Sequence, residues 1–468
     1  MNTSLRYNDI LTNITIADMA AEGKCIAKTE DGAVIFVPHT APGDVADIKI
    51  LKKDKKYYEG VAVHFHHYSP QRTSPACTHF GTCGGCKWQH IPYDVQIAYK
   101  QRQVHDALVR IGNLKIHEIM PIIGSKSAYY YRNKLEFTFT NQRWLHIDDM
   151  GNDNVEKRGL GFHIPGRFDK VLDLEQCHLQ VPVSDSIRNE IKKFAIAHNI
   201  SFYDARARSG LLRILMIRTG TTGEVMVLIQ FHMPDYEHIN KLLDYVRAQF
   251  PTITSLLYAI NTKANDTLEG VEVHTHSGKS YIMEKLENLH FKISPKSFFQ
   301  TNTSQAHILY QKVRELAQLS AHDTVYDLYT GTGTIAIFLA QYCKKIIGIE
   351  YVPAAVADAD ENATLNSIRN ATFVAGDIAK VLNDDFVAHH GIPDVVITDP
   401  PRAGMHAYVV EMLLKILPPV IIYVSCNPAT QARDLAMMSD KYEIVAVQPV
   451  DMFPHTHHVE SVVKLKLS

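Results

Sequence analysis

The segment from residue 320 to the C-terminus alternates between short apolar runs and helix-like runs, and this pattern constrains the fold most strongly. Runs such as TVYDLY, KIIGIE and DVVITDPP are each followed by a stretch with helical spacing. Near-continuous apolar strands separated by helices indicate a parallel sheet that is covered on both faces. The last two strands follow each other through a short connection, which predicts that the final strand is antiparallel. The C-terminal part is therefore expected to be an α/β domain with a doubly wound, mostly parallel sheet.

The preceding residues have a different pattern, and 468 residues are too many for a single core. Residues 1–67 alternate between apolar and polar positions with glycine and proline at the turns, which predicts a small antiparallel all-β barrel. Residues 93–112 have the apolar spacing of a helix, and residues 122–285 combine strands with an amphipathic helix. The chain is therefore expected to be multidomain, with an α+β region in its centre.

Composition argues against several classes of protein. Lys and Arg number 48 against 50 Asp and Glu, so the chain is not a globally basic nucleic-acid binder, although short basic runs such as KILKKDKKYY are present. No apolar run approaches the roughly 18 residues of a membrane span, and the N-terminus lacks the pattern of a secretory signal. Seven cysteines in such a chain do not indicate a disulfide framework. A cytoplasmic location is expected, without membrane association and with no protein partner implied.

The residues at the strand ends indicate a cofactor site, because ligands of doubly wound sheets bind at the carboxyl edge. The first strand leads through Asp327 into a turn with Gly331 and Gly333, and the second ends at Glu350. Glu350 suits ribose hydroxyls, and Asp377, which ends the third strand, suits an adenine amino group. A dinucleotide fingerprint would need a third glycine, but Thr-Ile-Ala follows the second. The pattern favours S-adenosylmethionine over a dinucleotide.

Cys426 follows the fifth strand and precedes Asn-Pro and a helix. Thiolates are stabilised near helix N-termini, which predicts a lowered pKa for this thiol. Beside a methyl donor, a thiolate can add to carbon 6 of uracil and thereby make carbon 5 nucleophilic, after which a base must remove the carbon-5 proton. Glu460 begins the last strand, and its position alone fits a catalytic base and an ordinary strand-edge acid equally well.

Three cysteines lie within ten residues, at Cys77, Cys83 and Cys86, and Cys177 is the natural fourth member of the group. Four thiolates suit a [4Fe-4S] cluster. They suit structural zinc as well, and the spacing alone does not decide between the two.

The motifs SCNPATQARDL, DPPRAGMH, HHVES and SFFQTNTSQA resemble those of the RNA uracil-5-methyltransferases, in particular the RumA-like branch that modifies 23S ribosomal RNA. The resemblance extends over essentially the whole chain. It implies a Rossmann-like methyltransferase that uses S-adenosylmethionine, with Cys426 as the nucleophile and Glu460 as the base that removes the carbon-5 proton. It also implies cofactor contacts from Gln300, Tyr329, Glu350 and Asp399. Phe298 would stack on the target base, with core packing as the alternative.

The resemblance also implies functions for the N-terminal half. Residues 1–67 resemble a TRAM domain, an OB-like barrel that binds RNA. The central domain would comprise residues 68–92 and 122–285, and the methyltransferase domain residues 93–121 and 286–468. In the RumA-like branch the four cysteines hold a [4Fe-4S] cluster, which favours the cluster over zinc. Because the branch that modifies transfer RNA lacks the cluster, the cysteines favour 23S ribosomal RNA as the substrate.

Four alternatives are weaker. A transfer-RNA uracil-5-methyltransferase would use the same chemistry on another RNA. A DNA cytosine methyltransferase would have no use for an RNA-binding barrel. A non-catalytic RNA-binding module would be expected to have lost the thiol, the base or the cofactor carboxylate, whereas Cys426, Glu460 and Glu350 are all present. A redox protein built on the cluster would leave Cys426 and Glu460 unexplained.

Overall fold

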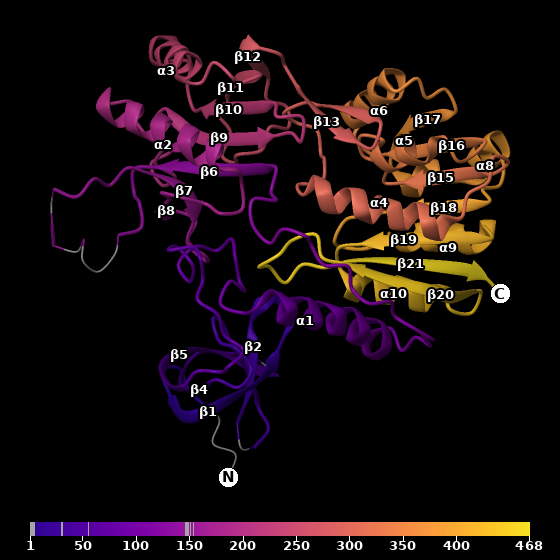
Figure 1. The fold of residues 1–468 in the computed structure, drawn as a ribbon, viewed down its shortest axis with the longest axis horizontal. Helices are drawn as coiled ribbons and strands as arrows, with labels where there is room; N and C mark the ends of the chain where they lie inside the picture. Colours follow the sequence, from indigo (N-terminus) through magenta and orange to yellow (C-terminus); the bar gives the residue numbers. More distant parts are fainter. Residues whose placement is uncertain (1–4, 30, 55, 146–148, 150, 153) are drawn as a thin grey trace.

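The computed structural model describes residues 5–29, 31–54, 56–145, 149, 151–152 and 154–468. The chain forms a barrel, a central sheet with helices, and a C-terminal sheet with helices on both faces (Figure 1). In that view the barrel lies at the lower left, the central sheet above it and the C-terminal sheet to the right. Within the described part of the chain, no helix combines the length and the apolar character needed to cross a membrane.

Five strands near the N-terminus close into a barrel in the order β1-β2-β3-β5-β4. Its elements are β1 (Ile10–Met19), η1 (Ala21–Gly23, a 3-10 turn), β2 (Cys25–Lys28), β3 (Val34–Val37), β4 (Val45–Lys53) and β5 (Tyr57–His67). Side chains alternate inward along β4, so that Ile48 and Ile50 are fully buried. The prediction of a wholly antiparallel barrel is wrong for one pair. β3 and β5 run parallel. β4 is antiparallel to both β1 and β5, so β5 has the direction of β1, which is also the direction of β3.

The central part is a seven-stranded sheet in the order β12-β11-β10-β9-β6-β7-β8. Its elements are β6 (Lys134–Thr140), β7 (Gly159–His163), β8 (Val171–Asp173), α2 (Pro182–Ala197), β9 (Leu212–Thr219), β10 (Val225–Phe231), α3 (Tyr236–Gln249), β11 (Ser255–Ile260) and β12 (Val273–Gly278). Leu242 and Val246 of α3 and Ile187 and Ile191 of α2 are buried in one apolar core with the sheet. Each such fully buried side chain contributes about 1.5–3 kcal/mol.

The C-terminal sheet has the strand order β17-β16-β15-β18-β19-β21-β20. Between it and the barrel lie α1 (Tyr93–Asp106) and the π-helical turn η2 (Ala107–Ile111), and the hairpin β13 (Ile282–Leu286) and β14 (Leu289–Ile293) precedes it. Its own elements are α4 (Thr303–Ala317), β15 (Thr324–Leu328), α5 (Thr334–Ala340), β16 (Lys345–Glu350), α6 (Pro353–Leu365), β17 (Ala371–Ala375), α7 (Ile378–Val381), α8 (Asp384–His390), β18 (Val395–Thr398), α9 (Ala407–Ile416), β19 (Val420–Ser425), α10 (Pro428–Met438), β20 (Tyr442–Val450) and β21 (Glu460–Leu467).

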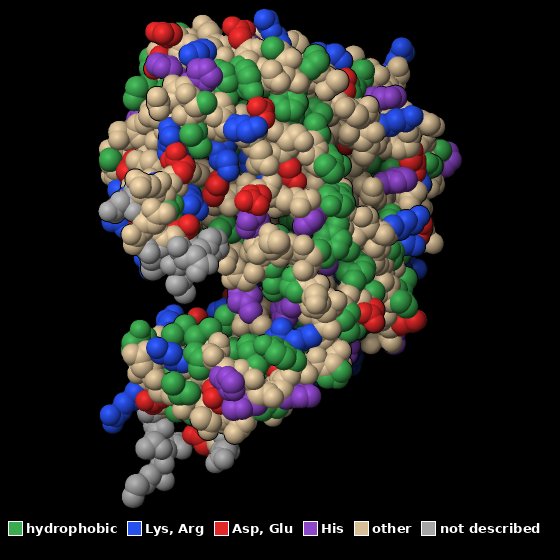
Figure 2. All heavy atoms as spheres, turned by 60° about the vertical axis from the view of Figure 1, so that its left-hand side comes forward, with side chains coloured by type: hydrophobic (Ala, Val, Ile, Leu, Met, Phe, Trp, Pro, Cys, Tyr) green, Lys and Arg blue, Asp and Glu red, His purple; other side chains and the backbone are tan. Residues whose placement is uncertain are grey.

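The first five strands of this sheet are parallel, and β21 is antiparallel to both of its neighbours. The predicted doubly wound sheet with an antiparallel last strand is therefore confirmed. One apolar core packs α4, α5 and α6 on one face, and a second packs α1, α9 and α10 on the other. This arrangement brings the carboxyl ends of β15, β16, β18 and β19 to one edge. Figure 2 shows a hollow between the barrel and the upper parts of the molecule, with His, Lys and Arg side chains along its border.

Candidate active site

Two glycines in the loop between β15 and α5 have different roles. Gly331 and Gly333 have φ angles of 57° and 74°, which residues with a side chain rarely adopt. A Cβ atom on Gly333 would lie 2.9 Å from the Cβ atom of Ala359 in α6, so this glycine is required by close packing. A Cβ atom on Gly331 would meet nothing within 4 Å. The backbone at Gly331 therefore borders open space.

Glu350 ends β16, and two backbone donors hold its carboxylate beside this loop. The N–H of Gly331 donates to Oε2 at 3.1 Å, and the N–H of Val352 donates to Oε1 at 2.9 Å. Asp377 follows β17 and accepts a hydrogen bond from the N–H of Ala379 at 3.1 Å. Both carboxylates are half-buried, so both lie at the edge of the sheet where a nucleoside would bind.

Asp327 and Asp399 place two further carboxyl groups at the same edge. Asp327 is 1% exposed; its Oδ2 accepts from the hydroxyl of Thr330 at 2.5 Å, while its Oδ1 has no hydrogen-bond partner among the described residues. Burial raises the pKa of Asp327 to about 7, with a further contribution from the charge of Asp399, and burial also raises the pKa of Asp399 to about 7. A cationic ligand would stabilise the ionised carboxylates. The sulfonium and ammonium groups of S-adenosylmethionine fit this pair of carboxyl groups.

Cys426 and Glu460 lie beside each other across two neighbouring strands. Ser425, the last residue of β19, is paired with Ser461 of β21 in an antiparallel register. The residue after Ser425 is Cys426, and the residue before Ser461 is Glu460, so the two side chains belong to the next opposed pair. Glu460 is 4% exposed, and Cys426 is half-buried. The thiol and the carboxyl group are thus brought together from positions 34 residues apart in the sequence.

The predicted lowering of the thiol pKa is wrong. Burial, together with the charges of Glu460 and Asp399, raises the pKa of Cys426 to about 11. The helix that follows, α10, begins at Pro428 and is capped by Asn427, whose Oδ1 accepts from the N–H of Ala429 at 3.2 Å. Burial and the two carboxylates outweigh this helix N-terminus. Burial and Asp399 also raise the pKa of Glu460 to about 8.

Arg402 is a member of the site to which the sequence analysis gave no role. Its charge lowers the pKa of both Cys426 and Glu460, against the effect of burial. Its guanidinium lies 3.3 Å from the imidazole nitrogens of His458, and its carbonyl accepts a hydrogen bond from Nδ2 of Asn427 at 3.0 Å. Its position in the DPPR motif, which follows β18 and carries Asp399, is the sequence feature that could have identified it.

The segment between β14 and α4 lies against the loop between β15 and α5. The hydroxyl of Thr332 donates to the carbonyl of Phe298 at 3.2 Å. The Phe298 side chain is 68% exposed, so the alternative of core packing is wrong, and it is the neighbouring Phe299 that is buried. Gln300 is half-buried two residues later. Tyr329, directly after β15, has a φ angle of 65°, which is strained for a residue with a side chain.

The four clustered cysteines, Cys77, Cys83, Cys86 and Cys177, are all half-buried free thiols. Burial, together with the charges of the other three thiols, raises the pKa of Cys86 to about 12, so Cys86 lies within electrostatic reach of the other three. Across the described residues, no group of three or more His, Cys, Asp or Glu side chains is arranged to hold a single metal ion. The chemistry of the donor set fits an iron–sulfur cluster, whose occupancy stays a prediction.

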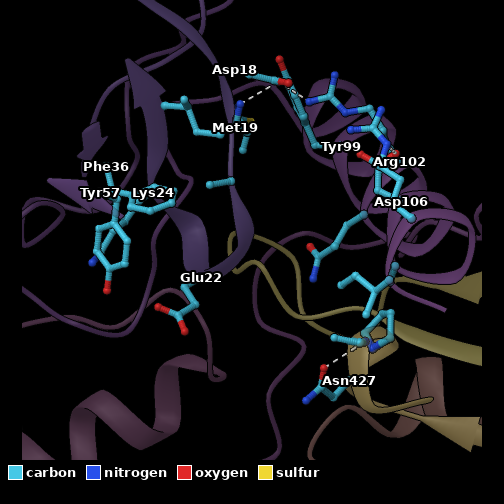
Figure 3. Close-up of a pocket in the computed structure, with 18 of the residues that line it drawn as sticks. Asp18, Met19, Glu22, Lys24, Phe36, Tyr57, Tyr99, Arg102, Asp106 and Asn427 are labelled. Atoms are coloured by element: carbon cyan, nitrogen blue, oxygen red, sulfur yellow. Dashed lines mark hydrogen bonds and ion pairs between the residues drawn. The ribbon is translucent and has the colours of Figure 1, made fainter. Parts of the chain in front are cut away.

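A groove of about 670 Å³ opens beside the start of α10 (Figure 3). Its walls come from the barrel, from α1 and from Asn427–Ala429 at the start of α10. Asp18 of the barrel pairs with Arg102 of α1 on one side of the groove, and Asn427 lies at its base. The groove therefore joins the barrel to the edge of the sheet that carries Cys426.

Comparison with protein families gives two matches. The model described as tRNA (Uracil-5-)-methyltransferase matches residues 272–468, which span the hairpin β13–β14 and the C-terminal sheet. The TRAM domain model matches residues 12–63, which form the closed barrel.

Comparison with individual proteins gives matches over nearly the whole chain. A protein of Bacteroides thetaiotaomicron, described as an uncharacterized RNA methyltransferase, is 54% identical over 96% of this chain and all of its own length. A protein of Porphyromonas gingivalis with the same description is 53% identical over 96% of this chain and 98% of its own. The solved structure of Pyrococcus abyssi tRNA (uracil-54, C5)-methyltransferase in complex with S-adenosyl-L-homocysteine is 29% identical, with a TM-score of 0.73. The match covers 96% of this chain and 99% of that one.

Proposed function

The chain belongs to the S-adenosylmethionine-dependent RNA uracil-5-methyltransferases, and from that membership we propose that Cys426 is its nucleophile and Glu460 its base. The observation that carries the proposal is the register of β19 and β21. It sets the thiol and the carboxyl group side by side at the edge that also carries Asp327, Glu350 and Asp399.

The two residues divide the reaction between them. The Cys426 thiolate adds to carbon 6 of the uracil, and the electron pair of the double bond makes carbon 5 nucleophilic. Bound S-adenosylmethionine supplies an electrophilic methyl group on its sulfonium, and carbon 5 takes that methyl group. The Glu460 carboxylate then removes the carbon-5 proton, the double bond re-forms, and the bond between sulfur and carbon 6 breaks to release Cys426.

The protonation states of the site are consistent with a nucleophile that the positive charge of the cofactor activates. A pKa of about 11 for Cys426 and about 8 for Glu460 keeps most of both groups protonated at neutral pH. The positive charge of the cofactor, at an edge crowded with carboxyl groups, would lower both pKa values. The charge of Arg402 acts in the same direction.

The remaining site residues are proposed to bind the cofactor and the target base. Glu350 would accept from the ribose hydroxyls, and the unpartnered Oδ1 of Asp327 would accept from the ammonium group of the methionine moiety. The exposed Phe298 ring would stack on the extruded uracil, which offsets part of the cost of removing the base from its stack. The full set proposed to contact the cofactor is Gln300, Asp327, Tyr329, Gly331, Gly333, Glu350, Asp377 and Asp399.

The proposed substrate is a uridine in 23S ribosomal RNA, and the four cysteines are proposed to hold a [4Fe-4S] cluster that shapes the central domain. The substrate is supported by the resemblance of the cysteine pattern to that of the ribosomal branch. The cluster is supported by the same resemblance and by the electrostatic proximity of the four thiols. Transfer RNA is the second candidate, because a solved structure that matches 96% of this chain is that of a tRNA (uracil-54, C5)-methyltransferase.

The test uses the purified protein, S-adenosylmethionine with a labelled methyl group, and unmodified ribosomal or transfer RNA. We expect label in 5-methyluridine of ribosomal RNA, its loss in Cys426→Ala, and a covalent RNA adduct that accumulates in Glu460→Gln. Cys343→Ala removes another buried thiol as a matched control and should keep activity. Label in transfer RNA alone would overturn the substrate and leave the chemistry intact. Full activity in Cys426→Ala would overturn the mechanism.

A further inference from the structure

A second cavity, which we call the α4 pocket, lies between the central sheet and the C-terminal sheet. Its volume is about 570 Å³, and its walls are the segment 125–133, the turn Thr219–Thr221 after β9 and the first turns of α4. Neither Cys426 nor Glu460 lines it. The pocket is thus separate from the reacting groups described above.

We propose that the α4 pocket binds the ribose and phosphate of an RNA nucleotide that neighbours the target uridine. The proposal rests on the proposed function, because it assumes that the substrate is RNA. It assigns a backbone-binding site to side chains that take no part in the chemistry.

The charge of the pocket matches a phosphodiester. Lys126 and Arg132 line it, and none of its described lining residues is an aspartate or glutamate. Lys126 is exposed, and within the described part of the chain neither cation takes part in an ion pair. Ser304, at the N-terminus of the 15-residue helix α4, adds an exposed hydroxyl and the positive end of the helix dipole. The neighbouring hydroxyl of Thr303 is already engaged, because it donates to Glu284 and accepts from Asn133.

Asn133 supplies an acceptor of the kind that a ribose needs. Its Nδ2 donates to the carbonyl of Gln300 at 3.0 Å and to the hydroxyl of Thr303 at 2.9 Å, which fixes the orientation of the amide. The side chain is 9% exposed and lines the pocket, yet its Oδ1 has no hydrogen-bond partner among the described residues. A buried acceptor without a partner is costly. This oxygen is covered in the structure, and a small shift of the amide would let it accept from the 2′-hydroxyl of RNA, a donor that DNA lacks.

A chain of side-chain contacts links the α4 pocket to the active site. The guanidinium of Arg132 lies 5.7 Å from the centre of the Phe453 ring, that ring lies 6.3 Å from the ring of His458, and His458 lies 3.3 Å from Arg402. Asn133 holds the carbonyl of Gln300 from the pocket side. A nucleotide in the pocket would therefore lie next to the surface on which the target base is presented.

The larger groove beside Asn427 is less suited to a phosphate. Its lining has four carboxylates, those of Asp18, Glu22, Glu59 and Asp106, against three cations, those of Lys24, Arg102 and Arg110. Each of these cations is held in an ion pair with one of these carboxylates. An anionic backbone would meet repulsion there and attraction in the α4 pocket.

The test measures the affinity of the full-length protein for an oligouridylate of about 15 nucleotides and for its deoxyuridine counterpart, over a series of salt concentrations. Wild type should bind the ribo-oligomer more tightly. Ser304→Glu, which places a negative charge on the pocket wall at an exposed position, should weaken ribo-oligomer binding by about tenfold or more. Lys126→Ala should reduce the slope of log affinity against log salt by about 0.7.

Two matched variants serve as controls. Ala354→Glu adds the same charge at the second residue of another helix, α6, and Lys241→Ala removes an exposed cation on α3; both lie outside the α4 pocket and should leave binding unchanged. Wild-type affinity and salt slope in Ser304→Glu and Lys126→Ala would overturn the proposal, as would equal affinity for the deoxy-oligomer.

Methyl transfer to RNA is measured separately, so that the pocket and the proposed function can fail independently. If methyl transfer is intact while the pocket variants bind RNA normally, the α4 pocket is not an RNA-binding site and the proposed function stands. If the pocket variants bind more weakly and wild type transfers no methyl group, the pocket stands as an RNA-binding site and the proposed function fails.

Discussion

The ammonium group of Lys100 lies 2.6 Å from Oδ1 of Asp451, and both side chains are completely buried. The hydroxyl of Tyr93 donates to the other carboxylate oxygen at 2.7 Å. Asp451 directly follows β20, whose last residue, Val450, is paired with Glu460 in β21. The ion pair therefore fixes α1 to the start of the loop that leads to the proposed base.

Lys100→Met should lower the free energy of unfolding by about 3–5 kcal/mol, because it leaves the Asp451 carboxylate buried without its cation. Urea unfolding measures the change. Lys415→Met is the matched control, since Lys415 pairs with Asp384 at the surface and such pairs contribute about 0–1 kcal/mol. An equal loss in both variants would contradict the importance of burial for the Lys100 pair.

Arg402→Gln should raise the pKa of both Cys426 and Glu460, because it removes the cation that lowers them. The thiolate fraction at a given pH then falls, and alkylation of Cys426 by iodoacetamide should slow about two- to tenfold near pH 8. Mass spectrometry of the modified peptide over a pH series follows this change. Arg402→Lys retains the charge and should stay close to wild type.

Asp399→Asn should move the same alkylation profile in the opposite direction. The Asp399 charge raises the pKa of both Cys426 and Glu460, so its removal should lower them and speed alkylation. If Asp399→Asn and Arg402→Gln moved the profile in the same direction, the electrostatic account of this site would be wrong.

Glu460 makes the stability of the protein depend on pH. Its pKa rises from an ordinary value of 4.5 to about 8 in the folded state, so the folded protein holds the proton more tightly than the unfolded chain. This contribution to stability is present below about pH 4.5 and is lost as the pH rises through about 8. Glu460→Gln, which cannot ionise, should therefore be more stable than wild type by about 5 kcal/mol at pH 9. Near pH 5 the difference should be small. Urea unfolding measures the free energy of unfolding of both proteins at the two pH values. A difference that is independent of pH would contradict the raised pKa of Glu460.

The C-terminal sheet could be predicted from the sequence because its pattern is local. The apolar runs in this part are strands of the sheet, most of them buried, and the short link before β21 already requires an antiparallel partner. The barrel was harder, since the parallel pairing of β3 with β5 depends on how β4 closes the barrel and leaves no mark within either strand.

The electrostatics of the site could not be predicted, because they depend on residues distant in the sequence. The local context of Cys426 displays the helix N-terminus, which lowers a thiol pKa. It does not display Asp399 and Glu460, which the sheet brings within range and which raise it. In the same way, only the register between β19 and β21 distinguishes Glu460 from an ordinary strand-edge acid.

Gly331 and Gly333, in the loop between β15 and α5, should respond differently to the same substitution. Gly333→Ala brings a Cβ atom to 2.9 Å from both the Cβ atom of Ala359 and the ring of Phe373, neither of which has a flexible end that can move aside. It should lower the free energy of unfolding by about 2–3 kcal/mol. Gly331→Ala meets no atom within 4 Å, so its cost is limited to the positive φ angle, about 1 kcal/mol. Its methyl group projects into the open space proposed for the cofactor and should weaken binding of S-adenosylhomocysteine about tenfold or more. Thermal unfolding and calorimetric titration separate the two effects, and tight binding by Gly331→Ala would place the cofactor away from this loop.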